Sequence, residues 1–404
     1  MSQKVIGLSG DEAVAYAVKQ CNVDVVAAYP ITPQTIIVER IADYVNDGEV
    51  DLEYIPVESE HSAMSACIGA AAAGARAFTA TAANGLALMH EVVYIASSLR
   101  LPIVMAIVNR ALSGPICIHC DHSDTMAERD SSWIQLYVED AQEAYDTVIQ
   151  AFRIAEDPSV LLPVMVNLDG FIVSHTLQDV SVLPDEVVSE FVGKRQVASI
   201  DVAGKTVPMM LHPDNPLTFG PLDLFDYYFE HKRQQEEAIK AARDVIKRVN
   251  DEYYKISGRR YGDGMVDSYR MDDADIAVVG LGSTMGTVKE VVDEERSRGL
   301  KVGAIRIRSF RPFPVDQLLE ELSRVKVVGV LDRSGAYGAP GAPVYNEIRS
   351  LLYDLDKRPA VLGYIYGIGG RDMPPELVKS VIRDLENALE KPPETKVEFI
   401  GVRE

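Results

Sequence analysis

The stretch Val23-Asp24-Val25-Val26-Ala27-Ala28-Tyr29-Pro30-Ile31-Thr32-Pro33 decides the fold. Its apolar first half predicts a β-strand over 23–28, and a helical pattern follows over 32–44. A strand that opens into a loop and then a helix is typical of α/β sheets, which bind ligands at the ends of their strands. The two prolines restrict the loop, so Thr32 can present its hydroxyl to a ligand at little cost in ordering. The alternative is that Thr32 is only the N-cap of the following helix.

The same alternation of strands and helices continues through the first 170 residues. It predicts a mostly parallel sheet that is covered by helices on both faces. Residues 109–130 interrupt the alternation and are expected to form a long loop. The expected strands are 23–28, 52–57, 77–82, 102–108, 134–138 and 161–166, and the expected helices are 11–21, 32–44, 59–74, 87–99 and 141–155.

The remainder of the chain divides into three parts. Residues 171–225 contain five prolines and predict an irregular arm that belongs to the first unit, 1–226. Residues 227–256 predict a long, charged linker helix with an apolar stripe. A smaller, separate α/β domain is expected in 257–404. Its strands are expected at 276–279, 302–307, 327–331 and 360–366, and its helices at 287–298, 315–325, 342–352 and 375–389.

The charge and composition of the chain argue against some classes of function. The net charge of −21 argues against nucleic-acid binding, because no basic surface could neutralise the phosphates. No apolar run approaches the length of a membrane span, and the start of the chain lacks the apolar core of a signal peptide. Four cysteines in 404 residues do not make a disulfide framework, so a location in the reducing cytoplasm is expected.

Polar side chains at two further strand ends are candidates for chemistry. Glu58 and Glu60 follow the second expected strand, where one carboxyl can cap the next helix while the other faces a cleft. Arg110 follows the fourth expected strand, and its guanidinium can bind a carboxylate through two hydrogen bonds. The alternatives are helix capping for both glutamates and a surface salt bridge for Arg110. Because parallel strands end at one edge, Thr32, Glu60 and Arg110 are expected to share one cleft.

Three other motifs suggest sites that the surrounding sequence does not support. Gly262-Asp263-Gly264 is similar to the start of a diphosphate-binding motif, but no strand precedes it and no asparagine stands at 287–295. The glycines from Gly280 to Gly286 are spaced GxGxxxG, and the next strand ends without an acidic residue, so a dinucleotide site is not favoured. Cys117-Ile118-His119-Cys120-Asp121-His122 has no second pair of ligands, so free thiols in a loop are favoured over a metal or redox site.

An ordered set of motifs carries a resemblance to a known family. The motifs are Tyr29-Pro30-Ile31-Thr32-Pro33, Glu58-Ser59-Glu60-His61, Asn109-Arg110-Ala111-Leu112-Ser113, Asp121-His122-Ser123-Asp124, Arg129-Asp130, Trp133-Ile134-Gln135, Asp169-Gly170-Phe171, Ser174-His175 and Arg308-Ser309-Phe310-Arg311-Pro312-Phe313-Pro314. This set resembles the α subunit of pyruvate:ferredoxin oxidoreductases and, more broadly, the 2-oxoacid:ferredoxin oxidoreductases. The resemblance extends over nearly the whole chain.

The resemblance implies a fold, an activity and a set of partners. It implies a pyrimidine-type thiamine diphosphate domain followed by a domain similar to the transketolase C-terminal one. The implied reaction converts pyruvate, coenzyme A and oxidised ferredoxin into acetyl-CoA, CO2 and reduced ferredoxin. The chain has neither a cysteine cluster motif nor a diphosphate–Mg2+ motif, so Mg2+ and the [4Fe-4S] clusters are expected on partner subunits. Those partners are β, γ and ferredoxin-like δ subunits, and the chain alone is expected to be inactive.

The resemblance also assigns individual residues. Glu60 matches the family's thiamine glutamate, which hydrogen-bonds nitrogen N1′ of the cofactor's pyrimidine and thereby favours its imino tautomer. Thr32 and Arg110 match the positions that hold the substrate carboxylate. Pro30 and Asn84 are expected to face the cofactor. No metal ligand is expected on this chain.

Several alternatives stay open on sequence alone. His122 and Asp124 are expected to shape the substrate pocket, with no assigned mechanism. The substrate could be 2-oxoglutarate or a branched-chain 2-oxoacid instead of pyruvate. A stand-alone thiamine-dependent decarboxylase or transketolase, or a non-catalytic NAD-binding module at Gly280–Gly286, would also fit parts of the sequence.

Overall fold

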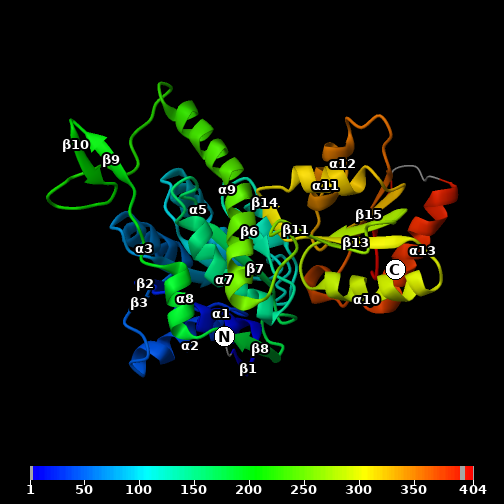
Figure 1. Cartoon of the computed structure of the whole chain (residues 1–404), viewed down its shortest axis with the longest axis horizontal. Helices are drawn as coiled ribbons and strands as arrows, with labels where there is room; N and C mark the ends of the chain where they lie inside the picture. Colours follow the sequence, from blue (N-terminus) through cyan, green and yellow to red (C-terminus); the bar gives the residue numbers. More distant parts are fainter. Residues whose placement is uncertain (1–2, 392–395, 404) are drawn as a thin grey trace.

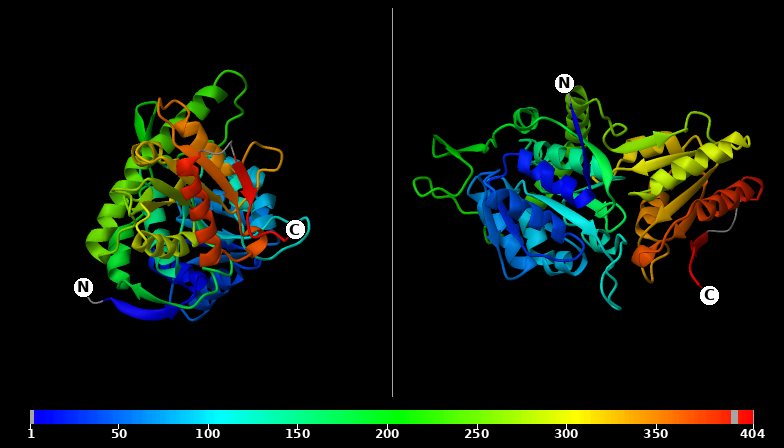
Figure 2. Two further views of the ribbon diagram at one scale, coloured as in Figure 1. Left: turned by 90° about the vertical axis from the view of Figure 1, so that its right-hand side faces the viewer. Right: turned by 90° about the horizontal axis from the view of Figure 1, so that it is seen from below.

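The chain folds around two large sheets that lie side by side (Figures 1 and 2). The computed structural model describes residues 3–391 and 396–403. Residues 1–2, 392–395 and 404, which fall within the expected units 1–226 and 257–404, lie outside the described residues. None of the described helices has the length and apolar character needed to cross a membrane.

The first sheet has seven strands in the order β14-β6-β7-β5-β4-β2-β3. Strands β2 to β7 are parallel to one another, as the alternating pattern predicts. Strands β4, β5, β6 and β7 are fully buried, because helices pack on both faces of the sheet. The strands are β2 (Val25–Ala28), β3 (Glu53–Pro56), β4 (Ala77–Thr81), β5 (Val104–Asn109), β6 (Ile134–Tyr137) and β7 (Val164–Asp169), and the helices are α1 (Gly10–Gln20), α2 (Thr35–Asn46), α3 (Glu60–Ala72), α4 (Ala83–Leu88), α5 (His90–Ser98), α6 (Ser123–Ala127) and α7 (Ala141–Ala155).

The second sheet has six strands in the order β11-β13-β12-β15-β16-β17. All are parallel except β11, which runs antiparallel to β13 at one edge. The chain then crosses back, and β14 (Ser309–Arg311) pairs with β6 of the first sheet. One strand of the 257–404 unit thus completes the sheet of the first unit. The other elements are β11 (Val266–Tyr269), β12 (Ile276–Gly280), β13 (Val302–Ile307), β15 (Val327–Asp332), β16 (Ala360–Ile365) and β17 (Lys396–Phe399), with α10 (Thr284–Ser297), α11 (Val315–Leu322), α12 (Pro343–Leu352), a 3-10 turn (Ile368–Gly370) and α13 (Pro375–Glu390).

The segment 171–225 contains more regular structure than the sequence predicts. Strand β8 (Gln178–Val182) pairs with β1 (Lys4–Leu8), and helix α8 (Asp185–Val192) follows it. Strands β9 (Ser199–Val202) and β10 (Lys205–Pro208) form a hairpin that projects from the body (Figure 1). The prediction of an irregular arm is wrong for these elements. Strands β1 and β8 are short, and their pairing connects distant parts of the chain, so the local sequence does not reveal it.

The long helix α9 (Tyr228–Ser257), which covers the expected linker helix, packs along the first unit (Figure 1). Its apolar stripe, which includes Ala238, Ala242 and Ile246, is buried in the same core as α1 and α7. A helix with one apolar face gains most of its stability from this burial.

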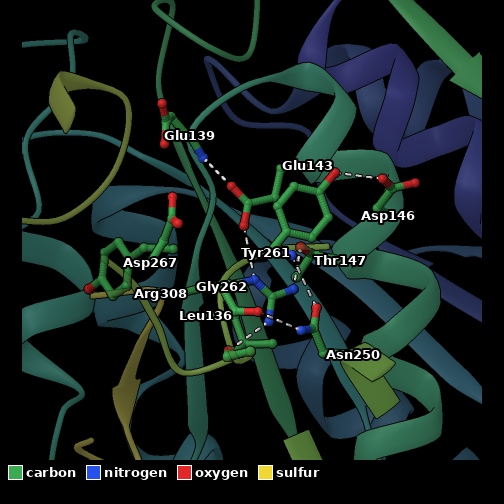
Figure 3. A network of polar contacts seen from close by, with 12 residues as sticks. Leu136, Glu139, Glu143, Asp146, Thr147, Asn250, Tyr261, Gly262, Asp267 and Arg308 are labelled. Atoms are coloured by element: carbon green, nitrogen blue, oxygen red, sulfur yellow. Dashed lines mark hydrogen bonds and ion pairs between the residues drawn. The ribbon is translucent and has the colours of Figure 1, made fainter. Parts of the chain in front are cut away.

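A buried ion network joins the second sheet to α7 (Figure 3). The carboxylate of Glu143 accepts hydrogen bonds from Arg306 Nη1 at 2.7 Å and from Arg308 Nε at 2.9 Å. Arg308 also donates to the carbonyl of Gly264 and the hydroxyl of Thr147. Burial lowers the pKa of Arg308, because a charged group loses its hydration there. Glu143 compensates the charge of both arginines, and Arg306 also pairs with Glu139 and Asp267.

Candidate active site

The structure places the five expected site residues at the carboxyl ends of four neighbouring strands. Pro30 and Thr32 follow β2, and Glu60 is the first residue of α3, after β3. Asn84 lies in α4, after β4, and Arg110 follows β5. Because β5, β4, β2 and β3 are adjacent and parallel, these residues lie along one edge of the sheet.

Glu60 is buried at this edge without a protein partner. The neighbouring residues stabilise the start of α3, since Ser59 accepts a hydrogen bond from the backbone N–H of Ser62 and Glu58 accepts one from the Ser62 hydroxyl. Glu60 is only 6% exposed, and its carboxylate makes no hydrogen bond within the described part of the chain. The helix-capping alternative is therefore wrong for Glu60.

A glycine makes room for the Glu60 carboxyl. A Cβ atom on Gly85 would lie 2.7 Å from Glu60 Oε1 and 2.4 Å from Thr81 Oγ1, so any side chain at this position would collide with both. The Thr81 hydroxyl is itself fully buried and has no hydrogen-bond partner among the described residues. A buried hydroxyl without a partner is expensive unless a ligand satisfies it, and the Glu60 carboxyl beside it also offers its hydrogen-bonding capacity to a ligand. This arrangement fits a bound heterocycle that offers polar ring atoms, such as the pyrimidine of thiamine diphosphate.

Arg110 is buried and has no carboxylate partner among the described residues. Its Nη1 donates to the backbone carbonyl of Thr32 at 2.9 Å, and its Nε donates to the carbonyl of Cys117 at 3.3 Å. The surface salt-bridge alternative is wrong, because the side chain is 7% exposed and its charge is not paired. A buried, unpaired guanidinium is a receptor for an anion.

The helix-capping alternative for Thr32 is also wrong. Helix α2 begins at Thr35, and its N-cap residue is Gln34, whose side chain makes no capping hydrogen bond. Thr32 lies in the turn before the helix and contacts Arg110 through its backbone carbonyl, which leaves its exposed side chain free to meet a ligand.

The other two expected residues are more exposed. Asn84 Oδ1 accepts hydrogen bonds from the backbone N–H of Ser113 at 3.2 Å and from its hydroxyl at 2.9 Å. This contact ties α4 to the segment that follows Arg110. Pro30 is exposed, and within the described residues no hydrogen bond connects it to the rest of the site.

A second cluster joins the edges of the two sheets. Asp169, at the end of β7, accepts hydrogen bonds from the backbone N–H of Ser283 at 3.1 Å, from its hydroxyl at 2.5 Å and from Arg333 Nη1 at 3.2 Å. His122 Nε2 lies 2.6 Å from the other Asp169 oxygen. Burial alone would raise the pKa of Asp169, but His122, Arg333 and Ser283 hold it well below its usual value.

This cluster bears on the glycine motif Gly280–Gly286. Ser283 and the following residues form the N-terminus of α10, where a helix favours an anion. The protein's own Asp169 carboxylate lies there, and a Cβ at Gly282 would be 2.9 Å from it. A dinucleotide phosphate would have to displace this carboxylate, which argues against the NAD-binding alternative.

The cysteines near the site are free thiols. Cys120, His122 and Asp169 offer ligand atoms within 4.8 Å of one another, but Arg333 already supplies the positive charge beside Asp169. Burial raises the pKa of the Cys120 thiol, so it stays protonated. Cys117 donates weakly to the carbonyl of Gly369. These contacts favour the interpretation as loop thiols.

The motif Gly262-Asp263-Gly264 forms a tight turn that leads into β11. Asp263 Oδ1 accepts hydrogen bonds from the backbone N–H groups of Met265 and Val266. Its carboxylate therefore stabilises its own turn, which agrees with the interpretation of this motif as a loop.

A cleft of about 700 Å³ opens beside Arg110. Ala111, Leu112 and Ser113, which follow Arg110, form one wall, and Ser334 and Tyr337, which follow β15, contribute to the other. The carboxyl edges of both sheets thus border one space.

Sequence reasoning missed several residues that shape this region. Gly85, Thr81, Ser283 and Arg333 were not expected to contribute, although each lies at or just after the end of a parallel strand. The rule that strand ends bind ligands could have found them if it had been applied to both sheets.

The fold agrees with comparisons to known families. A sequence model described as "Pyruvate flavodoxin/ferredoxin oxidoreductase, thiamine diP-bdg" matches residues 16–251. A second, described as "Pyruvate:ferredoxin oxidoreductase core domain II", matches residues 274–378. These matches define the class of protein as a thiamine diphosphate-binding α/β oxidoreductase.

Curated relatives agree over nearly the full chain. Pyruvate synthase subunit PorA of Thermotoga maritima is 55% identical, over 99% of this chain and 98% of the relative, and PorA of Methanocaldococcus jannaschii is 49% identical, over 98% of each. Ketoisovalerate oxidoreductase subunit VorA of Pyrococcus abyssi is 45% identical, over 95% of this chain and 94% of the relative. The chain belongs to the pyruvate flavodoxin/ferredoxin oxidoreductase family, and the predicted family and subunit type are confirmed.

Two solved structures share the fold. The 2-oxoglutarate:ferredoxin oxidoreductase from Magnetococcus marinus matches with a TM-score of 0.74 at 21% identity, over 94% of this chain and 65% of that chain. A split-gene transketolase matches with a TM-score of 0.54 at 14% identity, over 95% of this chain and 99% of that chain. The predicted fold class is confirmed.

Proposed function

We propose that this chain forms the pyrimidine-side wall of the active site in a complex that oxidises pyruvate. The complex converts pyruvate, coenzyme A and oxidised ferredoxin into acetyl-CoA, CO2 and reduced ferredoxin. The observation that carries the proposal is the 6% exposed Glu60 side chain beside Gly85, which has no hydrogen-bond partner among the described residues and shares its strand edge with Arg110, a guanidinium without a carboxylate partner there. Among the relatives above, the PorA subunits of pyruvate synthases are more similar in sequence to this chain than the VorA subunit of a ketoisovalerate oxidoreductase is.

Glu60 meets the pyrimidine ring in this proposal. Thiamine diphosphate, when bound, supplies the carbanion chemistry that cleaves the bond next to the 2-oxo group. Glu60 exchanges a hydrogen bond with a ring nitrogen, and its burial keeps water away from that bond. Pro30 and Asn84 border the cofactor.

Arg110 and Thr32 hold the carboxylate of the 2-oxoacid. Two hydrogen bonds to backbone carbonyls fix the Arg110 side chain, while its Nη2 has no partner within the described residues. The guanidinium therefore presents its free N–H groups to an anion in a fixed orientation, which lowers the entropic cost of binding. The exposed Thr32 side chain lies beside it.

Other subunits complete the enzyme in this proposal. We assign Mg2+ and the [4Fe-4S] clusters to partner subunits of the β, γ and δ types, and the complex to the cytoplasm. The chain's four cysteines support this, since Cys21, Cys67 and Cys120 are buried free thiols. Exposed apolar side chains before and at the start of α9 offer a surface for assembly: Leu222 is 88% exposed, Phe225 91% and Phe229 80%.

The test uses the assembled complex. Glu60→Gln should abolish proton exchange at C2 of bound thiamine diphosphate, and exchange at the wild-type rate would contradict the role of Glu60. Arg110→Ala should raise KM for pyruvate about 10- to 100-fold, the loss expected for a charge-assisted hydrogen bond of about 1.5–3 kcal/mol. An unchanged KM would contradict carboxylate binding. A panel with 2-oxoglutarate and branched-chain 2-oxoacids identifies the preferred substrate.

A further inference from the structure

A single buried carboxylate connects the loops that carry the candidate site. Asp124 is 2% exposed and follows His122, the N-cap residue of α6. Its Oδ2 accepts hydrogen bonds from the backbone N–H of Arg110 at 3.0 Å and of Ala83 at 3.1 Å. Its Oδ1 accepts hydrogen bonds from Asn109 Nδ2 and from the backbone N–H of Thr125, both at 2.8 Å. One side chain thus ties the end of β5 to the start of α4.

The two connected segments carry different parts of the site. Ala83 leads directly into Asn84 and Gly85, the residue that makes room for the Glu60 carboxyl. Arg110 carries the guanidinium for the substrate. The spacing of the two segments therefore sets the distance between Arg110 and the residues of α4 that border the cofactor and the Glu60 carboxyl, Asn84 and Gly85.

The backbone at Ala83 shows that this connection bears strain. Ala83 has φ +38°, a left-handed conformation that an alanine rarely adopts. Such strain costs on the order of 1 kcal/mol and persists only where surrounding contacts enforce it. The hydrogen bond from the Ala83 N–H to Asp124 is such a contact.

We propose that Asp124 is a positioning residue, which holds Arg110 and α4 at the spacing that the reaction requires. The inference rests on the proposed function, in which Arg110 binds the substrate carboxylate. Asp124 is not a catalytic residue, because it acts through the backbone of Arg110 and of Ala83. A displacement of about 1 Å at a reacting group can reduce a rate about 100-fold.

The substitution Asp124→Asn probes this role with little change in volume. The two oxygens of Asp124 accept hydrogen bonds from four N–H groups. An asparagine has one oxygen and one NH2 group, so its NH2 group would face two of these N–H donors and could not accept from them. The control is Asp263→Asn, at a carboxyl that is 37% exposed and also contacts Lys247 and Gln317. Asp263 Oδ1 also accepts from two backbone N–H groups, those of Met265 at 2.8 Å and Val266 at 2.9 Å, but its turn lies ahead of β11.

The experiment compares the variants in the assembled complex. Asp124→Asn should raise KM for pyruvate at least 10-fold and lower kcat/KM about 100-fold, with KM for coenzyme A unchanged. Asp263→Asn should leave all three constants within about twofold of wild type, even if both variants melt earlier. Equal kinetics for the two variants would overturn the inference.

A double-mutant cycle decides whether Asp124 acts through Arg110. In the Arg110→Ala background, Asp124→Asn should cause no further rise in KM for pyruvate, whereas additive effects would overturn the inference. If Arg110→Ala alone leaves KM unchanged, the proposed function fails and the inference fails with it. If Arg110→Ala raises KM but Asp124→Asn matches Asp263→Asn, only the inference fails.

A milder variant covers the case in which Asp124→Asn does not assemble. Asn109→Ala removes one donor to Asp124 Oδ1 and leaves the Arg110 bond in place. It should raise KM for pyruvate about 3- to 10-fold and leave KM for coenzyme A unchanged. An unchanged KM for pyruvate in this variant would overturn the inference.

Discussion

Replacing Glu143 by glutamine removes the charge that joins the second sheet to α7. In the folded chain Glu143 is 1% exposed, and its two oxygens accept from Arg306 at 2.7 Å and from Arg308 at 2.9 Å. Arg306 has further carboxylates nearby, at Glu139 and Asp267. Within the described residues, Arg308 has no other carboxylate, so the substitution leaves its guanidinium buried and uncompensated.

The expected loss of stability follows from these contacts. Each charge-assisted hydrogen bond contributes about 1.5–3 kcal/mol, which gives about 3–6 kcal/mol for the two. Removal of one partner of a buried ion pair costs about 3–5 kcal/mol in other proteins. Glutamine keeps one carbonyl acceptor, so we expect the free energy of unfolding to fall by about 3 kcal/mol.

Urea denaturation of the purified chain measures this loss. The control Glu320→Gln removes an exposed i,i+4 pair with Arg324, and it should change the free energy of unfolding by less than about 1 kcal/mol. The transition slope should stay the same for both variants. A loss below about 1 kcal/mol for Glu143→Gln would refute the view that Glu143 compensates both buried arginines.

Two further substitutions test other parts of the structure. Burial raises the pKa of Asp332 to about 7, so the folded chain keeps this proton while the unfolded chain releases it near pH 4. The free energy of unfolding should therefore fall as pH rises from 4 to 7. Over that range Asp332→Asn should become more stable relative to wild type. Parallel profiles of unfolding free energy against pH for the two proteins would contradict this. Gly85→Ala places a Cβ 2.7 Å from Glu60 Oε1 and should reduce turnover of the complex at least 10-fold. Gly69→Ala, with open space around its Cβ, should not reduce turnover. Equal activities of the two variants would contradict the view that Gly85 makes room for the Glu60 carboxyl.

The local pattern of apolar runs in the sequence predicted the edge of the sheet that carries the site. The apolar runs that became β2 and β5 are buried on both faces, and such runs are recognisable without knowledge of their neighbours. Thr32 and Arg110 each follow such a run along the chain, and Glu60 follows β3, which is only partly buried. The pattern missed β14, which has three residues, and β1, which has five residues of which only Ile6 and Leu8 are partly buried.

The partners of the charged side chains could not be predicted in this way. Arg110 could equally have formed a surface ion pair. It instead donates to the carbonyl of Thr32, a residue 78 positions away in the sequence. Asp169 fills the N-terminus of α10 and meets Arg333, 164 residues further along. No local pattern encodes such distances.

By itself, the sequence determined the parallel sheets, the shared edge at which the strands end and the family of the protein. These features depend on apolar periodicity and on motifs within short windows of the chain. Only the tertiary structure decided that Glu60 and Arg110 are largely buried without a charged partner among the described residues, and that Asp124 ties the Arg110 segment to the start of α4. The physical reason is that desolvation and hydrogen bonding depend on which distant segments pack together, and that packing exists only in the folded chain.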